Sequence, residues 1–190
     1  MKIILLVSGL VFGLNACSTP PVYPITIAPQ PTISSAPVAQ NKSVMVDSRD
    51  LRIAQFVAFV DNGRENVQPI HATSNILDVL EDVLIRQLNS QGFYVNTDGI
   101  GKLRLDLLDA LVKVKNSVFS HEMTTNVQIQ LVAETKNNKL VKRYTGRSTI
   151  EGTMNASVED IGVALNSLLE VVLKDIARDE QMITFLNENF

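Results

Sequence analysis

The chain of 190 residues has one cysteine and no tryptophan, and only 19% of its residues are charged. A single thiol excludes disulfide-rich scaffolds, and the low charge excludes a long, charged, disordered chain. Seventeen Lys and Arg against 20 Asp and Glu give a net charge of −3. Proteins that bind duplex nucleic acid need a dense positive field instead, so we expect no nucleic-acid partner.

No apolar run in the sequence is long enough to predict a transmembrane helix. The clearest candidate, residues 3–12, has ten residues without a charge and follows Lys2. At about 1.5 Å per residue, this run spans only half of a hydrocarbon core roughly 30 Å thick. A positive start, a short apolar run and the small residue Ala16 are typical of a secretory signal peptide. We expect this signal peptide to comprise residues 1–16.

The only cysteine stands directly after this signal. Leu14, Asn15, Ala16 and Cys17 resemble the lipobox of bacterial lipoproteins, in which the thiol receives diacylglycerol before cleavage; Asn15 is a departure from that pattern. An unpaired thiol in an exported chain favours the same interpretation. We expect Cys17 to anchor the protein to a lipid bilayer through its acyl chains. Because Ser18 rather than an Asp follows Cys17, we expect the anchored protein to be located at the periplasmic face of the outer membrane.

Proline is scarce after residue 47, where only Pro69 remains, but six prolines lie between residues 18 and 46. Such a density prevents a continuous helix or central strand. We therefore expect residues 17–46 to be the lipidated cysteine with a proline-rich tether, and residues 47–190 to be one globular domain.

The first half of this domain predicts a strand, a turn and a helix. Residues 51–60 are apolar on both alternating faces, as in an interior strand, and Asp61, Asn62 and Gly63 form a turn. A helix capped by Thr73 or Ser74 ends at Gly92. Its apolar stripe consists of Ile76, Leu80, Val83, Leu84 and Leu88.

The second half predicts an antiparallel meander followed by a long helix. The alternation over residues 103–114 changes phase at Leu107 and Leu108, which indicates a bulge. Strands at 126–133 and 140–151 are joined by a turn at Asn137 and Asn138. Ser157 and Asp160 form a capping box, and a short terminal helix follows near residues 182–186. The long helix has the stripe Ile161, Ala164, Leu165, Leu168, Leu169, Val172 and Ile176.

These elements predict an α+β fold with a mixed, mainly antiparallel sheet of about four to five strands. The sheet packs against two main helices in two layers.

Several stretches of the sequence are similar to the YajG-like family of bacterial lipoproteins. They are the lipobox, residues 80–84, 92–95, 150–152, 155–157, 161, 164 and 166–169, and Phe185. The resemblance implies a small α+β lipoprotein that faces the periplasm from the outer membrane. It implies one functional residue, the lipidated Cys17.

Residues able to carry catalysis are few. His71 and His121 are fifty positions apart and lack metal-ligand spacing, so we expect no metal and no cofactor. Asp106 and Asp109 flank the expected bulge, which brings them onto one face if it is present. The sequence thus favours a non-catalytic protein that binds or scaffolds an envelope partner. Two alternatives stay open: a small periplasmic hydrolase that uses this carboxylate pair or His121, and a lipid or glycan carrier.

Basic residues concentrate in one part of the chain. Residues 102–147 hold nine basic and four acidic side chains, whereas residues 148–190 hold two basic and eight acidic ones. We expect a face for an anionic partner, such as an envelope protein or an anionic polymer, recognised by the summed field. Its candidate residues are Lys136, Lys139, Lys142, Arg143 and Arg147.

Overall fold

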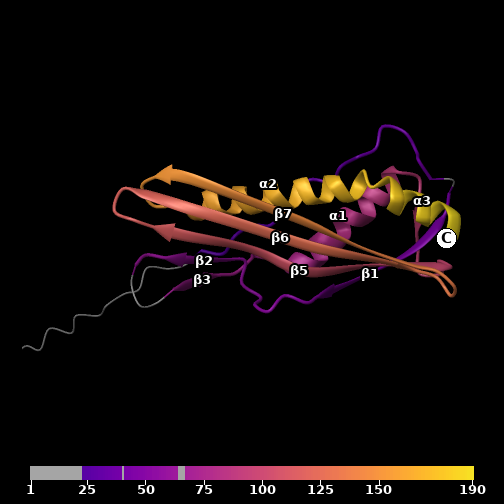
Figure 1. The fold of residues 1–190 in the computed structure, drawn as a ribbon, viewed down its shortest axis with the longest axis horizontal. Coiled ribbons are helices and arrows are strands. Elements are labelled where there is room, and N and C mark those ends of the chain that lie inside the picture. Colours follow the sequence, from indigo (N-terminus) through magenta and orange to yellow (C-terminus); the bar gives the residue numbers. More distant parts are fainter. Residues whose placement is uncertain (1–22, 40, 64–66) are drawn as a thin grey trace, which may run out of the picture.

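The computed structural model describes residues 23–39, 41–63 and 67–190, so the expected signal peptide and Cys17 lie outside the described residues. Ten elements follow one another along the chain (Figure 1). They are β1 Ser43–Asp50, β2 Ala58–Asp61, β3 Gln68–Ile70, α1 Ile76–Ser90, β4 Tyr94–Val95, β5 Gly101–Asn116, β6 Ser120–Glu134, β7 Lys139–Thr153, α2 Val158–Ala177 and α3 Glu180–Asn189.

The sheet is built around the long strand β5. On one side β5 pairs antiparallel with β6, which in turn pairs antiparallel with β7. On the other side two shorter strands share the same edge in succession, both parallel to β5: β1 lies along its first half and β2 along its second. β4 extends the sheet beyond β1, and β3 extends it beyond β2. The expected mixed sheet is confirmed, with seven strands rather than four to five.

The prediction of an interior strand at residues 51–60 is wrong for residues 51–57, which form no strand, and β2 begins only at Ala58. The chain leaves β5 where the Leu51 N–H donates to the Leu107 carbonyl (2.8 Å) and returns where Val112 donates to Val57 (2.9 Å). Between these points the register of β5 shifts at the bulge that the sequence predicts. A bulge interrupts the regular row of backbone groups on its strand, so the neighbouring chain bends away and leaves Ile53 fully exposed.

The helices follow their predicted patterns closely. All five residues of the first stripe are buried in α1, although Asn75, and not Thr73 or Ser74, accepts the capping hydrogen bond from the Leu77 N–H. Gly92 follows the helix with φ of +91°, a conformation that favours glycine. The capping box of Ser157 and Asp160 is present at the start of α2, and its whole predicted stripe is buried. α3 buries Met182 and Leu186.

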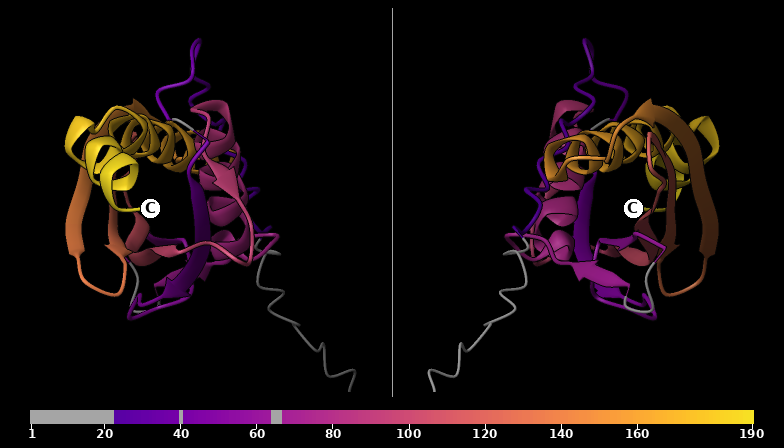
Figure 2. Two further views of the ribbon diagram at one scale, coloured as in Figure 1. Left: turned by 90° about the vertical axis from the view of Figure 1, so that its right-hand side faces the viewer. Right: turned by 90° about the vertical axis from the view of Figure 1, so that its left-hand side faces the viewer.

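The helices cover one face of the sheet, which curls along its length (Figure 2). α2 packs on β5, β6 and β7, and α1 packs on β1 and β4. Their interface holds the largest fully buried side chains, among them Leu105, Leu131 and Leu165. Burial of each such side chain stabilises the fold by about 1.5–3 kcal/mol. The opposite face of β5, β6 and β7, here called the open face, carries polar and charged side chains. The arrangement of helices on one face of a mixed sheet confirms the predicted α+β class.

Residues 23–39 form a strap that packs along both helices instead of the expected tether. Ile25, Ile27 and Pro29 are buried, and alternate backbone N–H groups donate to helix side chains. The pairs are Ala28 with Asn166 (2.9 Å), Gln30 with Glu170 (2.9 Å), Thr32 with Gln87 (3.1 Å) and Ser34 with Ser90 (3.0 Å). Pro29 and Pro31 occupy the positions between these donors, where the absence of an N–H costs nothing. The folded body therefore starts well before the expected boundary at residue 47.

Candidate binding face

The five basic residues predicted to share a face do not all do so. Along β7, side chains alternate between the helices and the open face, and register places Lys142 opposite the buried Leu131. Lys142 therefore lies on the helix side, where its Nζ is 2.5 Å from the carboxylate of Asp179. Arg143 and Arg147 lie on the open face because their positions are odd in the same alternation.

Two further predicted residues lie at the edge of this group. Lys139 is on the open face at the start of β7 and pairs with Glu134 at 3.2 Å. Lys136 lies in the turn between β6 and β7. The predicted group is thus divided between the turn, the open face and the helix side, so its charges do not act on one partner surface together.

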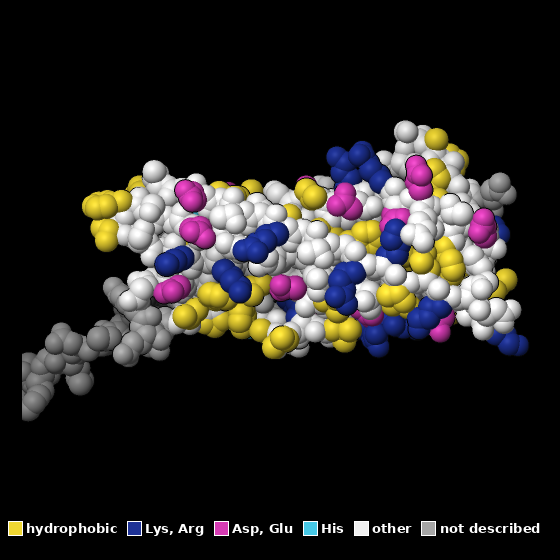
Figure 3. Space-filling view, in the orientation of Figure 1, with side chains coloured by type: hydrophobic (Ala, Val, Ile, Leu, Met, Phe, Trp, Pro, Cys, Tyr) yellow, Lys and Arg dark blue, Asp and Glu magenta, His cyan; other side chains and the backbone are white. Residues whose placement is uncertain are grey.

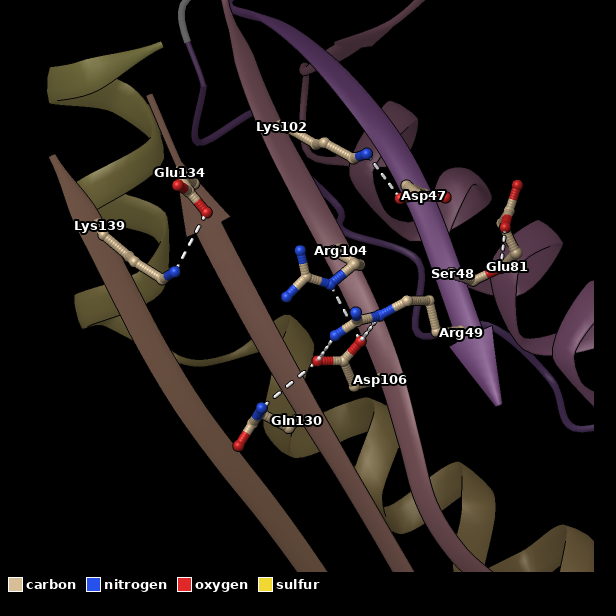
Figure 4. Close-up of polar contacts among 10 residues, drawn as sticks. All are labelled: Asp47, Ser48, Arg49, Glu81, Lys102, Arg104, Asp106, Gln130, Glu134 and Lys139. Carbon is tan, nitrogen blue, oxygen red and sulfur yellow. Dashed lines mark hydrogen bonds and ion pairs between the residues drawn. The ribbon is translucent and has the colours of Figure 1, made fainter. Parts of the chain in front are cut away.

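The centre of the open face is a buried carboxylate held by two guanidinium groups. Asp106 is 1% exposed and lies on β5. The Arg49 side chain, from the neighbouring β1, donates to both of its oxygens at 2.8 and 3.0 Å. Arg104, two residues earlier on β5, donates from Nε at 3.0 Å (Figure 4). A carboxylate that accepts charge-assisted bonds from two sides is fixed in position.

The same network continues across the sheet to β7. The Gln130 amide on β6 donates to Asp106 at 3.4 Å, and its oxygen accepts a hydrogen bond from Arg143 at 3.3 Å. We name Arg49, Arg104 and Arg143, together with Asp106 and Gln130, the cationic strip. It crosses β1, β5, β6 and β7, and Figure 3 shows Lys and Arg side chains distributed over this face with Asp and Glu among them.

Three guanidinium groups around one carboxylate leave the cationic strip with a net positive charge. Burial alone raises the pKa of the Asp106 carboxyl, but the hydrogen bonds from Arg49 and Arg104 outweigh it and hold this pKa below its ordinary value. Asp106 is therefore ionised at neutral pH and neutralises only one of the three cations. Arg49 is 49% exposed, so part of the remaining charge faces solvent.

The predicted carboxylate pair does share the open face. The bulge changes the alternation of β5, so that Asp106 lies opposite Gln130 and Asp109 lies opposite Gln128. Burial raises the pKa of Asp109, which lines an open groove of about 410 Å³ with Arg52 and Phe56. Asp106 does not line this groove, and its oxygens are already occupied by two arginines. The pKa of Asp106 is lowered and that of Asp109 is raised, but the two carboxylates do not line the same groove.

The histidines lie apart from this pair. The His121 Nδ1 is 2.9 Å from the Met154 carbonyl, and its ring packs over Gly152, where a Cβ would meet it at 2.4 Å. His71 is exposed and follows β3. Across the parts of the chain that the structure describes, no group of three His, Cys, Asp or Glu side chains is placed to hold a metal ion.

A carrier for lipid or glycan needs a cavity between the helices and the sheet. The cavity found at this interface, lined by residues such as Leu84, Leu131 and Ile176, has a volume of about 10 Å³. This is the space of about one water molecule. The interface is therefore packed by its own side chains.

The sequence prediction missed Arg49, Arg104 and Gln130. A signal was present, since charged side chains occupy alternate positions at 47 and 49 and again at 102, 104 and 106. What it lacked was the pairing of β1 with β5, which brings residues 57 positions apart into contact.

Comparisons with known proteins agree with this fold. The family model described as "Uncharacterized lipoprotein" matches residues 29–187. The uncharacterized lipoprotein YajG of Escherichia coli strain K12 is 27% identical over 182 residues, which is 94% of this chain and 93% of that protein. The crystal structure of protein XCC0632 from Xanthomonas campestris has a TM-score of 0.57 at 12% identity and covers 90% of this chain and 99% of that one, so it shares the fold.

Within the described residues, no helix is both long and apolar enough to cross a membrane. The family match extends from the strap to the end of α3 and includes every strand of the sheet. The chain therefore belongs to the family of uncharacterized lipoproteins whose model it matches, and it is similar to YajG over nearly its whole length, as the sequence resemblance predicts.

Proposed function

We propose that this envelope lipoprotein is attached to the periplasmic face of the outer membrane through acylated Cys17 and acts without catalysis, by binding an anionic envelope partner on its open face. The family supports the lipoprotein part of this proposal. The lipobox at residues 14–17 and Ser18 support the anchor and its membrane.

The observation that carries the binding role is the charge of the cationic strip. Its three arginines come from three strands: Arg49 and Arg104 contact the ionised Asp106, and Arg143 contacts Gln130. A guanidinium group presents several donors in a plane that matches carboxylate and phosphate groups. An acidic patch of an envelope protein, or an anionic polymer, fits such a surface by charge and by hydrogen bonding.

The contacts of Asp106 also favour binding over hydrolysis. A general acid must hold a proton near neutral pH, whereas the arginines hold the pKa of Asp106 low. Without Asp106, the groove beside Asp109 has one carboxylate and no imidazole among its lining residues. A single carboxylate does not make the paired acid and base that the hydrolase alternative requires.

The proposal is tested by site-specific photo-crosslinking in living cells. A photoreactive amino acid replaces Thr145 on the open face in one strain, and Val171 on the exposed side of α2 in another. We expect a specific crosslinked product from position 145 and none from position 171.

Charge reversal then shows whether the contact is electrostatic. Arg143→Glu combined with Arg147→Glu should reduce the product at position 145 at least tenfold. The control, Lys174→Glu with Arg178→Glu, makes the same change in charge on α2 and at its end. Equal loss from both double variants, or no loss from the first, contradicts binding through the open face.

A further inference from the structure

One end of the elongated molecule gathers several chain segments, and we call it the hairpin end. It contains the β5–β6 turn, the end of β7 and the start of α2, at the left of Figure 1. The Met154 N–H donates to the Phe119 carbonyl at 3.0 Å and so joins β7 to this turn. Asn116 donates to the Asn62 side chain at 2.7 Å, which brings the end of β2 to the same place.

Large apolar side chains are exposed at the hairpin end. Val118 and Phe119, in the β5–β6 turn, are 84% and 83% exposed, and Met154, directly after β7, is 75% exposed. Val67 before β3 and Val163 on α2 are exposed as well. Figure 3 shows hydrophobic side chains at this end of the molecule. Contiguous apolar surface of this kind marks an interaction site with a partner or a membrane.

The direction of the strap shows on which side of the molecule its first described residue, Tyr23, lies. β2 is parallel to β5, so both run toward the hairpin end, and β3 is antiparallel to β2 and runs away from it. The strap is parallel to the chain after β3, through the bridge between Ile25 and Ala72. It therefore also runs away from the hairpin end, and Tyr23 and Pro24, which precede Ile25, lie on the side nearer to that end.

The packed strap leaves only a short connection to the expected anchor. Cys17 and Tyr23 are six positions apart, and covalent geometry limits such a stretch to about 20 Å. β5 alone has 16 residues, which corresponds to a length of roughly 50 Å. An acyl anchor at Cys17 therefore keeps Tyr23, which lies on the hairpin side of the strap, within about 20 Å of the bilayer.

We infer that the hairpin end rests on the bilayer and that Val118, Phe119 and Met154 enter its interface. This inference rests on the acylation of Cys17 in the proposed function. Charges of both signs stand behind the apolar turn, since Glu122 lies opposite Glu151 in the β6–β7 register and opposite Lys115 in the β5–β6 register. The contact is therefore apolar rather than an attraction to anionic headgroups. It also fixes the orientation of the body, with the open face directed sideways along the membrane.

The absence of tryptophan makes a direct test possible, because one introduced indole is the only one in the chain. Phe119→Trp places it at the hairpin end, and the matched control Ile100→Trp places it at the opposite end on a side chain that is 82% exposed. The full acylated chains are purified from membranes and reconstituted into phosphatidylethanolamine and phosphatidylglycerol vesicles, with and without dibrominated lipid.

We expect the fluorescence of Trp at position 119 to fall at least threefold with brominated lipid, and that at position 100 to change by less than a fifth. The fluorescence at position 119 should fall by the same factor when phosphatidylcholine replaces phosphatidylglycerol, because an apolar contact does not depend on anionic headgroups. Acylated protein that floats with the vesicles, but whose indole at 119 is not quenched, overturns this inference and leaves the anchor intact. Protein that carries no acyl chain by mass spectrometry and does not float overturns the anchor and this inference together.

Discussion

Asn166 on α2 holds two residues of the strap through one side chain. Its Oδ1 accepts a hydrogen bond from the Ala28 N–H at 2.9 Å, and its Nδ2 donates to the Thr26 carbonyl at 3.0 Å. The amide thus offers the strap the same donor and acceptor that a neighbouring strand would offer. This contact makes the proline-rich segment part of the folded body, and it sets the short distance between the body and Cys17.

Replacement of this amide should loosen the strap. Asn166→Ala removes two hydrogen bonds, each of which contributes roughly 0.5–1.5 kcal/mol. We expect the free energy of unfolding to fall by about 1–2 kcal/mol in urea titration, and the strap to be cleaved faster in limited proteolysis. Ser167→Ala, at the next and exposed position of α2, is the control and should change neither measurement. Unchanged proteolysis of Asn166→Ala would mean that the strap is held without this residue.

The ion pairs of Asp106 should stabilise the fold at neutral pH. Asp106→Asn removes the charge that Arg49 and Arg104 contact, and hydrogen bonds to charged groups are worth about 1.5–3 kcal/mol each. We expect a loss of about 2–3 kcal/mol at pH 7, measured by urea denaturation.

The pH dependence of this loss follows from the sign of the shift. Because the pKa of Asp106 is lower in the folded state, its stabilisation is complete above the unfolded value near 3.9 and disappears as the pH falls through the folded value. The stability difference between the native chain and Asp106→Asn should therefore be constant from pH 7 to about 5 and shrink below about 4. A difference that is independent of pH down to 3 contradicts the ion-pair account.

Asp109 should behave in the opposite way. Burial raises its pKa, so the ionised form is disfavoured in the folded state and lowers stability at neutral pH. We expect Asp109→Asn to raise the free energy of unfolding at pH 7 by up to about 1 kcal/mol. The gain should begin to shrink as the pH falls through the raised folded pKa, where the native carboxyl takes up its proton, and should vanish below the unfolded value near 3.9. A loss of stability at pH 7 would show that Asp109 makes a favourable contact as an anion.

A glycine on β7 allows α2 to approach the sheet. A Cβ at Gly146 would lie 2.8 Å from Val172 Cγ2 and 2.9 Å from Leu168 Cδ1. Gly146→Val should therefore lower the free energy of unfolding by about 1–3 kcal/mol through overpacking, despite the higher strand propensity of valine. Thr145→Val, on the open face, is the control and should be nearly neutral by thermal unfolding. Leu168→Ala removes one of the two clashing side chains, so Gly146→Val should cost less free energy of unfolding in the Leu168→Ala background than in the native chain.

Local patterns predicted the elements whose signals lie within a few residues of one another. Ser157 and Asp160 are three positions apart, and the stripe of α2 repeats every three or four residues, so both were visible in the sequence. The bulge in β5 was visible for the same reason, since the alternation changes phase at Leu107 and Leu108. The helix N-cap was displaced by one residue, to Asn75, because Thr73, Ser74 and Asn75 can all cap.

Contacts between distant parts of the chain could not be predicted in this way. The strap contains the prolines that usually mark free chain, and the hydrogen bond between Ala28 and Asn166 joins residues 138 positions apart. Asp106 was recognised as a residue of interest, but its partner Arg49 is 57 positions earlier on β1, a strand that the sequence prediction did not include. Its role changes from candidate acid to structural anion because of Arg49 and Arg104.

The central claim is that Cys17 fastens this body to a membrane, and intact-mass analysis of the protein extracted from cell envelopes tests it most directly. The account predicts a mature chain that begins at Cys17 and carries a diacylglyceryl thioether, and a Cys17→Ser variant that retains residues 1–16. A native chain that is cleaved elsewhere and recovered without fatty acid in the soluble periplasmic fraction would contradict it.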